Sequence, residues 1–89
     1  MKHWSIDIQG NVQGVFFRAT TRETAQKMGI KGFVENCPDG SVHIEAEASE
    51  EKLGKFLEWC HKGPPNANVT AVDYREEALK NYNGFEIKR

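Results

Sequence analysis

The chain has 89 residues, and its 12 lysines and arginines against 13 aspartates and glutamates give a formal net charge of −1. This length suits a single domain over residues 1–89, because independent folding units are rarely shorter than ~50 residues. With 38% hydrophobic and 28% charged residues, the composition is ordinary for a globular protein and excludes a disordered or low-complexity chain. The slightly negative charge disfavours a nucleic-acid-binding module, which normally presents a basic face.

No segment of the sequence indicates a membrane span or an export signal. No stretch approaches the ~20 apolar residues of a membrane-spanning helix, and the first residues hold no apolar segment of the signal-peptide type. The two cysteines are too few for a disulfide scaffold. We therefore expect a cytoplasmic protein that does not bind membranes.

The first elements in the chain are a strand and a helix joined by a glycine-bounded loop. Residues 5–9 alternate between apolar and polar side chains, which is the period of a half-buried strand. The loop follows over 10–14. Apolar residues at helical spacing then predict a helix over about 18–28, and Gly29 suits the position just after a helix end.

The next two strands form a predicted hairpin. Alternation of apolar and polar residues returns over 30–37 and again over 42–47. Between them, the sequence PDGS at 38–41 is a strong turn signal, since glycine tolerates a positive φ and aspartate can bond its own backbone.

A second helix follows the hairpin. Ser49 is a good helix cap, because its side chain can accept a hydrogen bond from a free backbone N–H. The apolar stripe of this helix consists of Leu53, Phe56, Leu57 and Cys60. Gly-Pro-Pro at 63–65 stops the helix, because proline cannot continue it.

The last elements are a strand over 69–75, with Val72 and Tyr74 facing inward, and a short strand over 85–87. The resulting order, β-α-β-β-α-β followed by a short extra C-terminal strand, is the ferredoxin-like pattern of the α+β class. It predicts a two-layer sandwich with both helices on one face of a mostly antiparallel sheet. Many unrelated functions share this fold, so the function has to be inferred from individual residues.

The segment 10–18, with the sequence GNVQGVFFR, joins the first strand to the first helix. The first N–H groups of a helix have no intrahelical partner, and together with the helix dipole they make an anion site that suits phosphate. Arg18 adds a planar cation that matches two phosphate oxygens. The segment lacks the Gly-Lys-Ser/Thr ending of a P-loop, so it implies no metal ion. On spacing alone, an ordinary turn with a surface arginine stays open.

This segment closely resembles the first signature of the acylphosphatase family, GxVQGVxFR. Residues 32–42 resemble the second signature, and residues 63–72 and 84–87 are similar to further family segments. The resemblance therefore spans almost the whole chain, in the same order and at compatible spacing. It implies a small, single-domain, ferredoxin-like, metal-free enzyme. Such an enzyme is a hydrolase acting on acid anhydrides, and it cleaves the carboxyl–phosphate bond of acyl phosphates.

The resemblance also implies which residues carry the reaction. By position, Arg18 would be the phosphate-binding catalytic residue, and Asn36 would orient the attacking water. The backbone N–H groups of the phosphate site would come from Gln13, Gly14, Val15, Phe16, Phe17 and Arg18. Acyl phosphates already have a good leaving group, and phosphoryl transfer depends mainly on positioning and charge stabilisation.

The expected partners follow from the same resemblance. The substrate would be a small acyl phosphate, and inorganic phosphate would be both a product and an inhibitor. The enzyme would be a monomer that needs no cofactor, no metal, no nucleic acid and no covalent intermediate.

The sequence departs from the commoner family pattern in a few places, and Cys37-Pro38 in the turn is one of them. Phe33 stands where tryptophan is frequent, and Glu35 stands where a basic residue is common. A carboxylate near the site would weaken the attraction of an anion. Adjacent strand residues face opposite ways, however, so we expect Glu35 to point away from Asn36.

The remaining candidates have simpler structural explanations. Cys60 belongs to an apolar helix stripe and Cys37 to the hairpin, and a disulfide between them is topologically possible but unfavourable in a reducing cytoplasm. No recognised zinc spacing is present. His43 is expected to be a structural residue of the sheet, because no partner carboxylate is identifiable by spacing. Thr20 and Thr21 could contact phosphate, although helix packing is the simpler role.

Two other functions stay open on the sequence alone. RNA-binding modules share the fold, but they need aromatic residues on the central strands and a basic surface, whereas 41–47 carries acids and no Phe, Tyr or Trp. A non-catalytic module for an anion or carbamoyl phosphate is the second, since acylphosphatase-like domains also occur inside larger maturation proteins. The presence of both Arg18 and Asn36 favours an enzyme. These residues recognise phosphate, so they do not identify the physiological acyl group.

Overall fold

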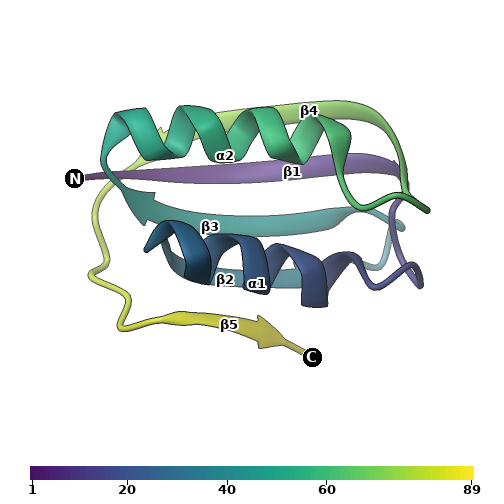
Figure 1. Ribbon diagram of the computed structural model, residues 1–89, viewed down its shortest axis with the longest axis horizontal. Coiled ribbons are helices and arrows are strands. Elements are labelled where there is room, and N and C mark those ends of the chain that lie inside the picture. Colours follow the sequence, from purple (N-terminus) through teal and green to yellow (C-terminus); the bar gives the residue numbers. More distant parts are fainter.

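The computed structural model describes residues 1–89, which form a five-stranded sheet and two helices (Figure 1). The elements along the chain are β1 (Lys2–Asn11), α1 (Phe17–Met28), β2 (Lys31–Asn36), β3 (Val42–Ala48), α2 (Glu50–Lys62), β4 (Asn68–Glu77) and β5 (Phe85–Lys88). Their order agrees with the sequence prediction. β1 and β4 are longer than predicted because they pair with each other beyond the residues that alternate in polarity.

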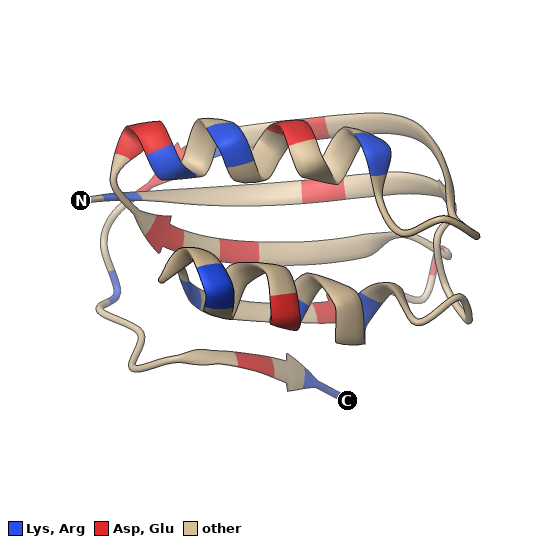
Figure 2. Ribbon diagram, viewed as in Figure 1, with Lys and Arg blue, Asp and Glu red and all other residues tan.

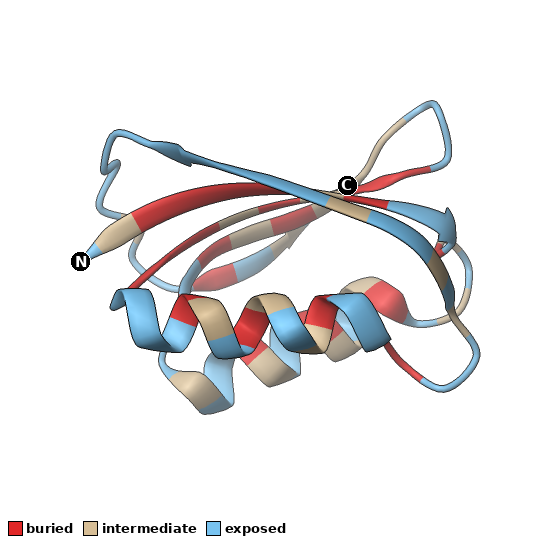
Figure 3. Cartoon of the chain, turned by 90° about the horizontal axis from the view of Figure 1, so that it is seen from above, coloured by how far each residue is buried: buried red, intermediate tan, exposed pale blue.

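Both helices are amphipathic and cover the same face of the sheet. Their ribbons carry charges of both signs (Figure 2), and their buried positions recur on the side toward the sheet (Figure 3). The buried helix residues are Phe17, Thr21, Ala25, Leu53, Phe56 and Cys60. As predicted, the Ser49 side chain caps α2 by accepting the Lys52 backbone N–H at 3.3 Å. Neither helix is long and apolar enough to cross a membrane.

The strands lie in the order β4-β1-β3-β2-β5. β1 pairs antiparallel with β3 and β4, and β2 pairs antiparallel with β3. β5 runs parallel to β2, so the sheet is mixed rather than purely antiparallel. This is the predicted ferredoxin-like sandwich with one added strand. β1 and β2 run in the same direction, which brings the end of β2 to the edge where β1 leads into α1.

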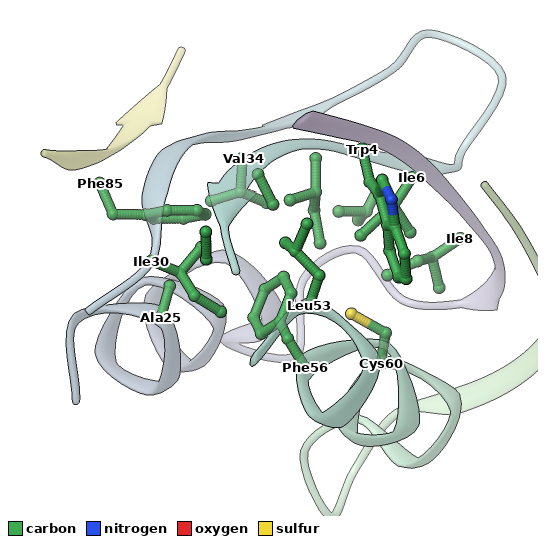
Figure 4. Packing of buried hydrophobic residues seen from close by; sticks show 14 of the residues in the cluster. Trp4, Ile6, Ile8, Ala25, Ile30, Val34, Leu53, Phe56, Cys60 and Phe85 are labelled. Carbon is green, nitrogen blue, oxygen red and sulfur yellow. The ribbon is translucent and has the colours of Figure 1, made fainter. Parts of the chain in front are cut away.

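The core lies between the sheet and the two helices (Figure 4). Ile6 and Ile8 point into it from β1, and Phe56 points into it from α2, all without exposed surface. Phe85 extends into the same cluster from β5, which holds this short edge strand against the layer. Cys60 is fully buried, as its place in the apolar stripe predicted.

Val72 and Tyr74 of β4 face the helix side of the sheet as predicted, because their partners in β1, Ile8 and Ile6, are core residues, but only Val72 is well covered. Val72 packs against the core, but Tyr74 is 52% exposed. Its ring lies over Trp4, with 4.5 Å between the ring centroids. β4 is an edge strand, and β1 is its one neighbour in the sheet. Its side chains therefore have neighbouring side chains on the β1 side and solvent on the other side.

The segment between β4 and β5, residues 78–84, crosses the helix-free face of the sheet and is called the strap below. Its backbone N–H groups converge on the Glu47 carboxylate, with donors from Lys80 at 2.5 Å, Asn81 at 3.1 Å and Tyr82 at 2.9 Å. Only 1% of Glu47 is exposed. The strap therefore covers a buried charge and connects β4 to β5.

Candidate active site

The loop between β1 and α1 has a backbone shape that most residues avoid. Val12 anchors it in the core with no exposed surface. Gly14 has φ 76° and Phe16 has φ 59°, so two loop residues occupy the left-handed region. A Cβ at Gly14 would meet nothing within 4 Å, so its conformation, rather than crowding, favours glycine there. Phe16 keeps this conformation with a side chain that is 81% exposed.

This shape leaves a row of backbone donors free. Phe16 occupies the helix cap position without a side-chain hydrogen bond, and the first turn of α1 contains no acidic residue. The N–H groups of residues 13–16 donate to no protein acceptor, and those of Phe17 and Arg18 belong to the first turn, where no intrahelical acceptor exists. The positive end of the α1 dipole adds to these donors. Free N–H donors at the positive end of a helix are an arrangement that can bind an anion.

Gln13 fixes the loop in place through its side chain. Its Nε2 donates to the carbonyl oxygens of Cys37 and Ser41, both at 2.9 Å. These carbonyls belong to the turn between β2 and β3, so the loop is tied to the hairpin beside it. This role was missed in the sequence, because only the tertiary structure brings residue 13 to residues 37 and 41.

Arg18 projects from the first turn of α1 and is half-buried. It forms no ion pair with any carboxylate. Its Nη1 donates to the Lys88 carbonyl oxygen of β5 at 3.4 Å. The guanidinium is thus oriented by a neutral group and keeps its charge available.

Asn36 is the last residue of β2 and lies on the helix side of the sheet, because it follows the buried Val34 by two positions. Its Oδ1 is buried and has no hydrogen-bond partner in the protein. Buried polar atoms are nearly always paired, so this oxygen is suited to a ligand or a water.

These residues meet in one pocket of about 280 Å³. Its lining consists of Val12, Gly14, Phe16, Phe17, Arg18, Ala19, Asn36, Ile87 and Arg89. No acidic residue lines the pocket, so it is positive although the whole chain carries a formal net charge of −1. Of the predicted site residues, Gln13 and Val15 do not line it. The Gln13 side chain turns to the hairpin, and Val15 packs against the core.

Glu35, the unusual acidic residue beside Asn36, lies outside the pocket. It pairs across the sheet with His43 on the helix-free face. The expectation that it points away from Asn36 is therefore correct.

His43 belongs to a polar cluster on that same helix-free face. It bonds through Nδ1 to Asp7 at 2.6 Å and through Nε2 to Glu45. Burial opposes the charged form of His43, but these two hydrogen bonds together outweigh burial and raise its pKa. Burial also opposes the charged form of Glu45, and hydrogen bonds from Ser5, His3 and His43 overcome it and lower the pKa of that carboxyl. The predicted structural role holds, but the carboxylate partners were missed because they come from strand pairing.

The other candidate residues have no place in the pocket. Cys37 and Cys60 are both free thiols, and burial raises the pKa of Cys60. Thr20 Oγ1 donates to the Phe16 carbonyl at 2.9 Å, and Thr21 is fully buried in the helix packing. No group of three or more His, Cys, Asp or Glu side chains is arranged to hold a metal ion.

The pocket unites the two segments that resemble acylphosphatase signatures, and the acylphosphatase family model matches residues 4–87. The chain belongs to the acylphosphatase family. An acylphosphatase of Thermotoga maritima is 48% identical over 88 residues, which cover 99% of this chain and 98% of the relative. The crystal structure of acylphosphatase from Bacillus subtilis is 36% identical, with a TM-score of 0.97 and 100% of both chains covered. HypF from T. kodakarensis is 31% identical with a TM-score of 0.87, but this chain covers only 12% of its length.

This acylphosphatase is therefore a hydrolase of acid anhydrides that converts acyl phosphates to a carboxylate and inorganic phosphate. The family, the fold and the activity implied by the sequence are confirmed. The non-catalytic alternative is set aside, because the acylphosphatase relatives match the chain along almost their whole length.

Proposed function

We propose that this acylphosphatase holds the phosphoryl group between Arg18 and the backbone N–H groups of residues 13–18, and that a water oriented by Asn36 attacks the phosphorus directly. One observation carries the proposal. A single pocket without acidic residues combines an unpaired guanidinium, free N–H donors and a buried amide oxygen without a partner.

The phosphoryl site is supported by its preorganisation. Donors that already point at the place where charge develops need no rearrangement during the reaction, which makes them effective in transition-state stabilisation. Gln13 ties the loop to the hairpin, and the Lys88 carbonyl orients Arg18. The planar guanidinium can then donate to two phosphoryl oxygens at once.

The water site is supported by the chemistry of an amide. Asn36 Oδ1 accepts one hydrogen of the water, while Nδ2 can donate to a phosphoryl oxygen. Water oxygen then forms a bond to phosphorus as the phosphorus–oxygen bond to the acyl group breaks. The bonding electrons leave with the carboxylate, and the hydrogens of the water end on phosphate or in solvent. No Cys, Ser, His, Asp or Glu lines the pocket, which favours this direct route over a covalent intermediate.

The proposed reaction uses no metal ion, because positive charge comes from Arg18 and the N–H donors. The test is hydrolysis of benzoyl phosphate in excess EDTA, followed by the loss of its ultraviolet absorbance. We expect the rate to equal that without EDTA. A rate lost in EDTA and restored by Mg²⁺ or Zn²⁺ would overturn the mechanism.

We further propose that the enzyme works as a monomer in the cytoplasm. Its pocket is formed by one chain, and the edge strand β4 carries charged residues that oppose edge-to-edge pairing. Its two free thiols suit a reducing compartment. Size-exclusion chromatography at several protein concentrations tests the monomer, and elution as a dimer would contradict it.

A further inference from the structure

Gln13 connects the loop before α1 to the chain beside Asn36. Its side chain turns away from the pocket, and its Nε2 donates one hydrogen bond to the Cys37 carbonyl and one to the Ser41 carbonyl, both at 2.9 Å. Cys37 is the residue directly after Asn36. The amide of Gln13 therefore joins the loop that carries the phosphate donors to the end of the strand that carries the proposed water site.

No other hydrogen bond makes this connection. The two bonds of Gln13 are the only ones between residues 12–16 of the loop and residues 36–41 of the hairpin. Val12 anchors the start of the loop in the core, but apolar packing is not directional, whereas a hydrogen bond is. The relative position of the two segments therefore depends on Gln13.

The position of the Asn36 amide depends on its backbone. Its Oδ1 has no hydrogen-bond partner in the protein. The backbone of Asn36 forms the last pair of the hairpin, with Val42, and the pairing of β2 with β5 ends one residue earlier, at Glu35. Beyond this pair, the chain at Cys37 is held by the turn itself and by Gln13.

The proposed reaction makes this relative position important. The loop N–H groups and Arg18 hold the phosphoryl group, whereas Asn36 holds the attacking water, so the two reactants are bound by separate segments. Attack requires the reacting atoms to lie about 3–3.5 Å apart and in line, and a misplacement of about 1 Å can lower the rate about 10²-fold. A tie between the two segments fixes this geometry before the substrate binds.

We propose that Gln13 is a positioning residue, whose side chain holds Asn36 and its water in line with the phosphoryl group by tying the loop to the hairpin. The inference rests on the proposed function, in which Asn36 orients the water. The Gln13 side chain contacts neither substrate nor water and acts through Asn36. Its loss should therefore lower kcat, while Arg18 and the loop N–H groups continue to bind phosphate.

The test measures kcat with benzoyl phosphate and the inhibition constant of inorganic phosphate, using the full chain. Gln13→Met keeps nearly the same length without a donor, and it should lower kcat about 10–100-fold. The phosphate inhibition constant should change less than about threefold. Each carbonyl keeps a backbone donor, from Gly40 at 3.1 Å or Cys37 at 2.9 Å, so Tm should fall by less than about 8 °C. Gln9→Met, at an exposed glutamine of β1, is the matched control and should behave as the wild type.

A double-mutant cycle with Asn36→Ala shows whether Gln13 acts through Asn36. In the Asn36→Ala background, Gln13→Met should lower kcat further by less than about twofold, because no oriented water is left to misplace. Gln13→Asn keeps the amide but is shorter by one methylene, so it cannot reach both carbonyls. It serves for the same comparisons if Gln13→Met is unfolded at the assay temperature.

Three results would overturn the inference. Unchanged kcat in Gln13→Met would show that the tie is not needed. A rise in the phosphate inhibition constant as large as the fall in kcat would assign Gln13 to the phosphoryl site alone. Losses that multiply in the double variant would show that Gln13 and Asn36 act independently. Unchanged kcat in Asn36→Ala alone would instead contradict the proposed function itself.

Discussion

Arg18 is a half-buried arginine whose charge no carboxylate neutralises. Arg18→Ala should lower kcat/KM by about 10²–10³, the usual cost of one preorganised donor to a developing oxyanion. Arg18→Lys should recover little, since an ammonium cannot reproduce the planar fork. Phosphate should inhibit the wild type competitively and fail to stabilise Arg18→Ala against heat. Arg22→Ala, an exposed arginine later in α1, is the control. Near-normal turnover by the lysine variant would disprove the bidentate role.

Asn36 is expected to act mainly in the transition state, by orienting the attacking water, while Arg18 and the loop supply most of the phosphate binding. Asn36→Ala should therefore lower kcat strongly and leave the phosphate inhibition constant nearly unchanged, the pattern of an interaction used in the transition state. Asn36→Asp should be a poor substitute, because a carboxylate has no N–H donor and repels phosphate. Kinetics and melting temperature should be measured together, with the exposed Asn83→Ala as control. Equal loss of phosphate binding would move Asn36 into the anion site.

At the scale of elements, the strap is held by one buried carboxylate. Burial opposes the charge of Glu47, yet the N–H groups of Lys80, Tyr82 and Asn81 overcome it and lower its pKa. Glu47→Gln removes the charge and one acceptor oxygen, so it should cost about 2 kcal/mol in the free energy of unfolding. For a domain of this size that corresponds to a fall of roughly 8–16 °C in Tm. Glu86→Gln, an exposed position in β5, should shift Tm by far less. Equal shifts would show that the strap is not held by Glu47.

For the whole molecule, the cluster on the helix-free face predicts how stability depends on pH. The pKa of His43 is raised above its ordinary 6.5, so its contribution is complete below pH 6.5 and is lost as pH rises through the folded value. The pKa of Glu45 is lowered from 4.5, so its contribution is complete above pH 4.5 and is lost as pH falls through the folded value. Both contributions are therefore complete between about pH 4.5 and 6.5.

Thermal unfolding from pH 5 to pH 9 checks this expectation. The Tm advantage of the wild type over His43→Gln should shrink as pH rises above 6.5. His61→Gln, an exposed histidine at the end of α2, should follow the wild-type curve. A difference between wild type and His43→Gln that is the same at every pH would show that the contribution of His43 does not depend on its charge.

Much of the fold could be predicted from the sequence, and so could the two residues proposed to act in the candidate site, Arg18 and Asn36, because both depend on local patterns. Alternation of polarity, helical spacing, the Asp-Gly turn and the Gly-Pro-Pro stop act within a few residues, so the order of elements followed from them. The segment 10–18 and Asn36 both belong to short sequence motifs. The segment follows the end of β1, and Asn36 is the last residue of β2. These features do not depend on which strands become neighbours.

The tertiary structure decided the contacts that join distant residues. Gln13 reaches the hairpin across 24 positions, and Arg18 reaches the Lys88 carbonyl across 70. The partners of His43, the exposure of Tyr74 and the place of Arg89 beside Asn36 all follow from strand order and register. Polarity along the chain records which side of its own strand a residue faces. It carries no information about which strand pairs next to it, and in this protein that pairing completes the candidate active site.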